Sequence, residues 1–230
     1  MKRVYPIGTT IYQPEQCSGG YNLISGSGVV KLVNMNGDVV HQWQVDPRNE
    51  KGFIHRARLL PNGRLMLLFG ARKVPGHIAE FDWTGNQTWE YTPERPAHHD
   101  FWPTESGSVL LICTIPLPKK YRDMIRDPER RQLEIFGDEL LEVNRDKEVV
   151  WRWVQHENMD VNICNPMPAS RDWGKGKDSN TITDWTHTNT IQALPENKWC
   201  DGGDERFKPG NVLQSMRQLD TISIVDRDNG

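Results

Sequence analysis

The chain has few cysteines, and their spacing excludes one class of site. Only four occur in 230 residues, and no two of them have the CxxC spacing of a structural zinc site. We therefore expect no cysteine-based metal centre. Cys113 lies in an apolar strand and is expected in the core. Cys164 and Cys200 lie in neighbouring insertions and would pair only in an oxidising compartment.

Long apolar runs and a large excess of charge are also missing. No stretch approaches the roughly 20 apolar residues that span a bilayer, and the net charge of −3 lacks the basic footprint of a nucleic-acid-binding protein. We therefore expect neither membrane nor nucleic acid among the partners. The N-terminal sequence lacks the apolar core of a secretory signal. The expected location is cytoplasmic if Met1 is the true start, and periplasmic if a signal precedes it.

What the chain does contain is a recurring block. Each full copy consists of an alternating strand, a polar turn and a second strand rich in aromatic residues, and the chain has nine tryptophans. Such a unit cannot bury its own apolar face, so its copies are expected to pack side by side. The copies are VVKLVNMNGDVVHQW at 29–43, IAEFDWTGNQTWEY at 78–91, LLEVNRDKEVVWRW at 140–153 and ISIVDRDNG, which stops at its turn, at 222–230.

Aromatic side chains stand at matching places four and six residues after the turn residue of each full copy. Residues two positions apart on a strand face the same side of the sheet. We therefore expect a shared docking slot between neighbouring units. The pairs are His41 and Trp43, Trp89 and Tyr91, and Trp151 and Trp153.

A further hairpin precedes each block, which gives four short strands per repeat. Repeats of this kind predict an all-β fold, a β-propeller of four-stranded blades. Because the fourth copy stops at Gly230, we expect residues 1–230 to form a single incomplete propeller domain, truncated after about four blades. The spacing of the copies predicts insertions near 116–136, partly helical, and near 157–183, an exposed loop.

Polar residues cluster where three of the inner strands begin, at 97–101, 184–189 and 215–220. Histidine is the side chain most easily poised for acid, base or nucleophilic work near neutral pH, and arginine offers a fixed fork for an anionic group. In a propeller such strand starts face a central channel. His99, His187 and Arg217 converging on that channel would make an anion-transfer site.

These side chains also have structural interpretations. His98 and His99 are adjacent, so on a regular strand only one of them can face the channel. Asp100 can satisfy a loop backbone or orient a histidine, and Arg217 can form a salt bridge between blades. Some histidines of a propeller only support the packing of its blades. We favour this role for His55, and a plain surface or blade-packing role for His41 and His77.

In these segments the chain resembles the arylsulfotransferase family, and the likeness runs along nearly its whole length. The ordered combination of HHDF, DWTH and a later SxR motif is fairly specific. The resemblance implies a six-bladed β-propeller with a central active site. Other similar segments, in family order, are VYPIGTTIYQPEQCSGGYNLI, VKLVNMNGDVVHQW, ARLLPNGRLML and PGNVLQSMRQLDTISIVDRDNG.

The resemblance also implies an activity. Members of the family move a sulfuryl group from an aryl sulfate donor to a phenolic acceptor, without a nucleotide donor or a cofactor, through a sulfohistidine. Carried over by motif, His99 and His187 would contact or protonate the leaving oxygen, and Arg217 would clamp the sulfuryl oxygens. The substrate-binding residues implied beside them are His98, Trp102, Trp185 and Asn189.

The attacking histidine of the family lies downstream of the SxR strand. If this correspondence holds, none of the seven histidines of the chain is the nucleophile. We therefore expect the nucleophile to be missing from this fragment, and the fragment alone to be inactive.

Three other functions remain open from the sequence. Blades rich in tryptophan and long loops also suit a non-enzymatic propeller that binds a partner or a glycan. A quinone-cofactor enzyme would share the tryptophan-docking repeat, although the adjacent cysteine pair of such enzymes is missing here. A metal site built from His99, Asp100 and His187 would suit a hydrolase.

Overall fold

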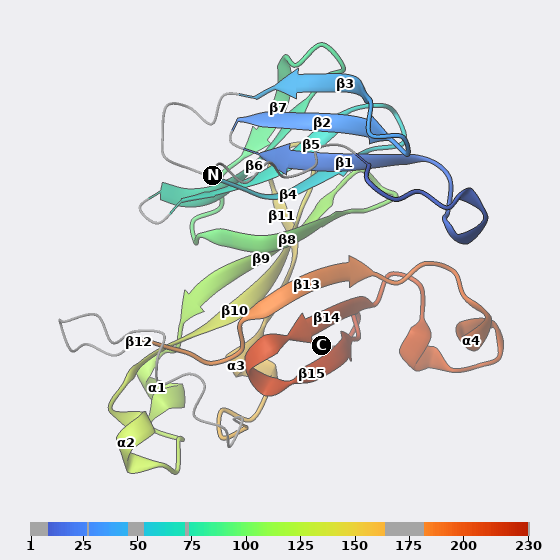
Figure 1. Cartoon of the computed structure of the whole chain (residues 1–230). Coiled ribbons are helices and arrows are strands. Elements are labelled where there is room, and N and C mark those ends of the chain that lie inside the picture. The colour runs from blue at the N-terminus through green and yellow to red at the C-terminus, as the bar shows by residue number, and fades with distance from the viewer. Residues whose placement is uncertain (1–8, 27, 46–52, 72–73, 164–181, 230) are drawn as a thin grey trace. The chain divides into compact units, whose positions relative to one another are not determined.

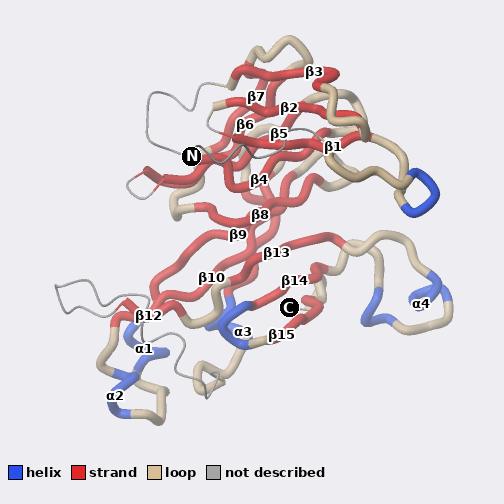
Figure 2. The backbone as a smooth tube through the Cα atoms, viewed as in Figure 1, coloured by secondary structure: helices blue, strands red, loops and turns tan. Residues whose placement is uncertain are grey.

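The computed structural model describes residues 9–26, 28–45, 53–71, 74–163 and 182–229 (Figure 1). Strands dominate it, and its helices are short (Figure 2). The chain divides into two compact units, Met1–Thr92 and Pro93–Gly230. No helix among the described residues is long and apolar enough to cross a membrane.

The first unit holds two antiparallel sheets in which each strand pairs with its neighbour in sequence. A 3-10 turn, η1 (Pro14–Gln16), precedes them. The first sheet contains β1 (Tyr21–Gly26), β2 (Val29–Asn34) and β3 (Val39–Gln44). The second contains β4 (Phe53–Leu59), β5 (Leu65–Ala71), β6 (Val74–Phe81) and β7 (Gln87–Tyr91).

Alternation along the strands builds the core of this unit. Leu65, Leu67 and Phe69 stand two positions apart on β5, so all three face one side of the sheet, where they pack with Trp43 and Val30. The turn residues of the hairpins adopt positive φ, which glycine accepts without a steric cost: φ is 92° at both Gly37 and Gly85. The predicted hairpins are therefore confirmed.

The docking slot predicted from the aromatic pairs is present between the two sheets of this unit. The ring of His41 stacks on Trp83 with 3.9 Å between centroids, and its Nε2–H donates to the carbonyl of Trp83 at 2.9 Å. The indole Nε1–H of Trp43 donates to the carbonyl of Asp82 at 3.1 Å. Both carbonyls belong to the turn of the next repeat, so the strand of one repeat is fastened to the turn of the following one.

Two more histidines of this unit have the packing roles that we favoured. The ring of His77 stacks on Phe69 with 4.9 Å between centroids. His55 lies so close to the backbone of Gly70 that a Cβ added there would be 2.1 Å from its Nε2 atom. Gly70 therefore leaves the space that the His55 ring fills.

The second unit holds a five-stranded sheet and a three-stranded sheet. In the larger one β8 to β11 are antiparallel neighbours, and β12 joins β10 in parallel. Its strands are β8 (Ala97–Pro103), β9 (Val109–Pro116), β10 (Glu134–Val143), β11 (Val149–Val154) and β12 (Ile182–Asp184). The smaller sheet contains β13 (Thr188–Ala193), β14 (Val212–Met216) and β15 (Thr221–Val225). The all-β class is thus confirmed.

The same docking contact recurs in this unit. The indole Nε1–H of Trp151 on β11 donates to the carbonyl of Arg227, which lies in the turn after β15, at 3.2 Å. The Arg227 guanidinium lies over the Trp151 ring, 5.2 Å from its centroid, and pairs with the carboxylate of Glu142.

The insertion after β9 is partly helical, as predicted. It holds α1 (Lys119–Arg122) and α2 (Pro128–Arg131), and Pro128 opens α2, where its missing N–H costs nothing. Asp127 caps α2 by accepting from two backbone N–H groups. The remaining short helices are α3 (Gln155–Asn158), α4 (Lys198–Asp201), η3 (Glu205–Phe207) and η4 (Arg217–Leu219).

Residues 164–181 of the second predicted insertion lie outside the described residues, so the loop expected there stays a prediction. Cys164 belongs to that stretch, and its pairing with Cys200 is likewise untested. Cys113 is fully buried on β9, as expected, and burial raises the pKa of its thiol well above the ordinary value.

Candidate functional site

His98 and His99 stand at an irregularity near the start of β8. The pairing of β8 with β9 shifts register between Ala97 and Phe101, and His99 has a φ of 58°. Non-glycine residues occupy this left-handed region uncommonly and at some cost in strain, and such residues cluster at functional sites. The alternation expected for a regular strand is therefore wrong here. Instead of facing opposite ways, the two rings meet, with 2.8 Å between their Nδ1 atoms.

His187 occupies an equivalent position just before β13. Its φ of 48° is also left-handed, and the pairing of β13 with β14 shifts register directly after it, between Thr188 and Thr190. The two histidines singled out by sequence are thus both held in strained conformations at bulged strand starts. Their rings lie edge to face, with 4.7 Å between centroids.

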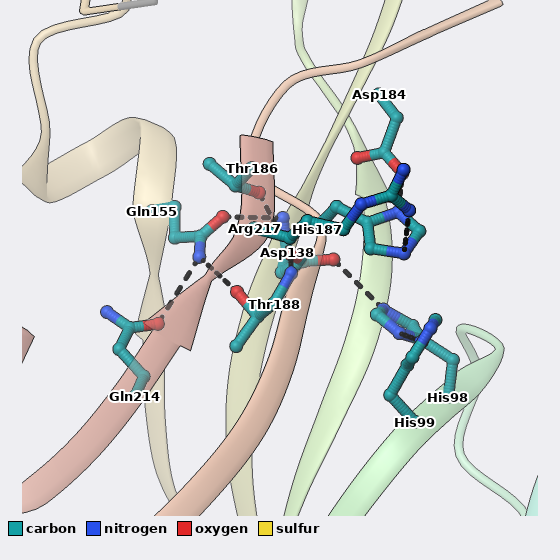
Figure 3. Close-up of polar contacts among 10 residues, drawn as sticks. All are labelled: His98, His99, Asp138, Gln155, Asp184, Thr186, His187, Thr188, Gln214 and Arg217. Carbon is teal, nitrogen blue, oxygen red and sulfur yellow. Dashed lines mark hydrogen bonds and ion pairs between the residues drawn. The ribbon is translucent and has the colours of Figure 1, made fainter. Parts of the chain in front are cut away.

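Arg217 reaches the same place from the end of β14. Its backbone N–H donates to the carbonyl of His187 at 3.1 Å, and its Nη1–H donates to Nε2 of His187 at 3.4 Å. On the other side of the ring, Nδ1–H of His187 donates to the carboxylate of Asp184. His187 is therefore held between a carboxylate and a guanidinium (Figure 3).

Asp138 on β10 is the buried centre of the polar network. Its Oδ1 accepts from Nε2–H of His98 at 2.9 Å. Its Oδ2 accepts from the hydroxyl of Thr186 at 2.8 Å and from the backbone N–H of Thr188 at 2.7 Å. Only 3% of its side chain is exposed. Figure 3 shows these contacts converging from three separate segments.

Gln155 supports this arrangement from α3. Its Oε1 accepts from the backbone N–H of Asp138 at 2.8 Å, and its Nε2–H donates to the hydroxyl of Thr188 at 2.9 Å. The same amide also lies 3.3 Å from Oε1 of Gln214. Because both carboxylate oxygens and the backbone N–H of Asp138 have partners, the buried carboxylate is fixed in position.

Burial would raise the pKa of the Asp138 carboxyl, but the surrounding donors outweigh it. The hydrogen bond and charge of His98, followed by the hydrogen bonds from Thr188 and Thr186, hold this pKa below its ordinary value. Asp138 is therefore an ionised, accepting group at neutral pH.

This shift predicts a pH dependence of stability. A carboxyl whose pKa is lowered by folding stabilises the protein above its ordinary pKa, about 3.9, and the contribution is lost as the pH falls through the lower folded value. We expect Asp138→Asn to be less stable than the wild type at pH 6, and the difference to narrow below about pH 4. Urea unfolding of both proteins across this range measures it. A difference that stays constant with pH would contradict the shift.

The remaining residues proposed from sequence have other surroundings. Asp100 is fully buried and accepts from the backbone N–H groups of Phe101 and Ile191, so it satisfies backbone groups. Trp185 is 3% exposed, packs in an apolar cluster and donates to the carbonyl of Ile163 at 2.7 Å. Trp102 packs against the other apolar cluster of this unit. Asn189 lies at the bulge of β13, half-buried.

The structure thus brings His98, His99, His187 and Arg217 together. Among the described residues, no three histidine, cysteine, aspartate or glutamate side chains are grouped as a metal site requires. The cluster offers imidazole and guanidinium nitrogens, and the carboxylates of Asp138 and Asp184 accept hydrogen bonds from two of the imidazoles. That chemistry suits an anionic oxygen group and proton transfer to or from it.

Asp138 was not predicted, although the sequence carries a signal for it. Residues 134–143 form a strand with carboxylates among apolar positions, and a carboxylate in a buried strand requires specific partners. Asp184 belongs to the polar segment 184–189 that the sequence singled out, but no role was predicted for this residue.

The site thus gathers histidines from two strand starts and an arginine from a strand end in an all-β protein, an arrangement that suits transfer of an anionic group. A family model described as "Arylsulfotransferase (ASST)" matches residues 23–229. The chain therefore belongs to the arylsulfotransferase family, as the ordered motifs indicated.

Comparison with other proteins adds little to this assignment. No curated protein matches the chain. Among solved structures, a protein of unknown function from Bacteroides caccae is 14% identical, with a TM-score of 0.30. The match covers 72% of this chain and 77% of that one. So distant a likeness does not bear on the fold.

Proposed function

We propose that the protein transfers a sulfuryl group from an aryl sulfate to a phenolic acceptor. Membership of the family supports the reaction class. The observation that carries the proposal is the meeting of His99, His187 and Arg217 at one place, although they come from three separate segments. A sulfate ester presents the anionic oxygens that such a cluster binds.

Arg217 and His187 act on the sulfuryl oxygens. The planar guanidinium can donate two parallel hydrogen bonds to an anionic group, and a group transfer of this kind depends mainly on positioning and on stabilising charge at the oxygens. Asp184 accepts from Nδ1–H of His187 and so holds the ring in place. The other ring nitrogen, Nε2, then faces the Arg217 guanidinium. His99 lies beside His187, and it takes the proton from the acceptor phenol or gives one to the leaving phenoxide.

Transfer proceeds through a sulfohistidine. In the first step the attacking nitrogen forms a bond to sulfur while the bond from sulfur to the donor's phenolic oxygen breaks. In the second step the phenolic oxygen of the acceptor forms a bond to sulfur while the N–S bond breaks, and the phenol's proton passes to His99. The family places the attacking histidine after the SxR strand, and residues 218–230 contain no histidine. Functional experiments are made on the complete gene product.

The same proposal extends to the architecture. The four sheets correspond to four repeats, and a strand of one repeat docks on the turn of the next within each unit. These contacts support blades of a β-propeller, with six blades in the family as a whole.

The test is release of 4-nitrophenol from 4-nitrophenyl sulfate, with and without phenol as the acceptor. We expect release that depends on the acceptor, together with formation of phenyl sulfate. The matched control is His77→Ala, which removes a histidine that packs on Phe69 outside the site. Release that is absent with and without acceptor would overturn the proposal and favour a propeller that only binds its ligand.

A further inference from the structure

We propose that Asp138, His98 and His99 form a proton relay in which Asp138, acting through His98, fixes the tautomer of His99. The inference rests on the proposed sulfuryl transfer for its role, but the relay itself is a property of the free protein. Its three members are joined in series by hydrogen bonds of 2.9 Å and 2.8 Å. Asp138 and His98 are positioning residues, and His99 is the one that meets the substrate.

The first link is set by the surroundings of Asp138. One oxygen faces the backbone N–H of Thr188, which can only donate, and the hydroxyl of Thr186 donates to the same oxygen. The carboxylate is therefore an acceptor at every contact. The remaining oxygen faces Nε2 of His98, so this nitrogen carries a hydrogen.

The second link follows from the chemistry of a neutral imidazole, which has one N–H and one lone pair. Because Nε2 of His98 carries the hydrogen, Nδ1 of His98 is the acceptor. The nitrogen that faces it, Nδ1 of His99, must then donate across the 2.8 Å contact. Nε2 of His99 consequently carries a lone pair and is the nitrogen able to take a proton.

The relay gives this proton a destination. As the acceptor phenol attacks sulfur, its O–H bond breaks and an N–H bond forms at Nε2 of His99. The proton on Nδ1 of His99 passes to Nδ1 of His98. The positive charge then rests on His98, whose other N–H is hydrogen-bonded to the carboxylate of Asp138. The same path run backwards protonates a leaving phenoxide.

The contacts also separate two histidines that the sequence treats alike. Nδ1–H of His187 donates to Asp184, and its Nε2 accepts from Arg217 at 3.4 Å. Protonation of His187 at Nε2 would break its hydrogen bond to the arginine. The contact of His99 with His98 instead gives a proton taken up at His99 a path toward Asp138, so His99 is assigned the proton transfer and His187 the positioning of Arg217.

The substitution Asp138→Asn tests the relay because it should exchange donor and acceptor in both of its hydrogen bonds. The backbone N–H of Thr188 needs an oxygen, so the new amide NH₂ must face His98. Nε2 of His98 then becomes an acceptor, its Nδ1–H donates to His99, and Nε2 of His99 gains the hydrogen. We expect kcat for aryl sulfate transfer to fall about 10²-fold, with KM for the donor little changed, since general acid–base catalysis typically contributes at least this factor.

Long-range ¹H–¹⁵N correlation spectra of the complete gene product report the tautomer directly, at a pH where the histidines are neutral. In the wild type, Nε2 of His99 should show the shift of an unprotonated nitrogen, and in Asp138→Asn that of a protonated one. The matched control is Glu139→Gln on the same strand, which neutralises a buried carboxylate that pairs with Arg152 at 2.8 Å. It should leave the His99 tautomer and kcat as in the wild type.

A protonated Nε2 of His99 in the wild type would overturn the relay, and this result needs no variant to fold. An unchanged His99 tautomer in a folded Asp138→Asn would also overturn it. If the tautomer reverses as expected but no aryl sulfate is turned over, the relay stands and the proposed function fails. If turnover is observed but the tautomer does not reverse, the relay fails and the proposed function stands.

Discussion

Replacing Arg217 by alanine is expected to lower kcat/KM for an aryl sulfate by about 10³-fold, the upper end of what one donor to a developing oxyanion contributes. Arg217 contacts His187 through both its backbone N–H and its guanidinium. Arg217→Lys keeps the charge but loses the planar fork, so we expect it to recover only part of the activity.

Steady-state release of 4-nitrophenol from 4-nitrophenyl sulfate measures this effect. The matched control is Arg206→Ala, because Arg206 lies on the exposed η3 turn and pairs only locally, with Asp204. We expect that variant to behave like the wild type. If Arg217→Ala is no worse than Arg206→Ala, the guanidinium does not bind the sulfuryl oxygens.

Replacing Trp43 by alanine is expected to destabilise the first unit by about 3–5 kcal/mol, as for other large side chains removed from a core. Trp43 is 1% exposed, packs with both sheets of that unit and donates to the carbonyl of Asp82. Trp43→Phe keeps an aromatic ring but loses the donor. We expect that variant to cost about 1–2 kcal/mol, the contribution of one hydrogen bond with some loss of contact.

Urea unfolding followed by circular dichroism measures both losses. Val40→Ala on the same strand is the control, because Val40 is 47% exposed and its truncation should cost well under the loss at Trp43. Equal losses for Trp43→Ala and Val40→Ala would show that the docking slot does not hold the two sheets together.

The repeats and hairpins could be predicted because their signals are local. An alternating strand, a turn with glycine at positive φ and a second strand specify a hairpin without reference to the rest of the chain, and Gly37 and Gly85 have that conformation. His99, His187 and Arg217 could be chosen because they stand in polar segments at strand ends of the repeats, although Arg217 follows β14 rather than beginning a strand as the sequence suggested. The structure brings these three together.

The relay was beyond the sequence because it depends on tertiary detail. A regular strand would separate His98 from His99, and only the bulge with its left-handed residue lets their rings meet. Asp138 lies 40 positions after His98 and belongs to no motif, so its role emerges only when β8 and β10 share a sheet. Trp185 shows the opposite case. It belongs to the DWTH motif, from which the family resemblance implied a substrate-binding role, and the structure packs it in an apolar cluster.

The central claim is that sulfuryl transfer passes through a sulfohistidine, and a trapped intermediate tests it most directly. The complete gene product would be mixed with an aryl sulfate without acceptor and quenched in base, to preserve the acid-labile N–S bond of a sulfohistidine. Its peptides would then be analysed by mass spectrometry. We predict one added sulfuryl group on a histidine, which phenol removes with formation of phenyl sulfate. Acceptor-dependent transfer with no such adduct would contradict the claim and indicate a direct displacement at sulfur.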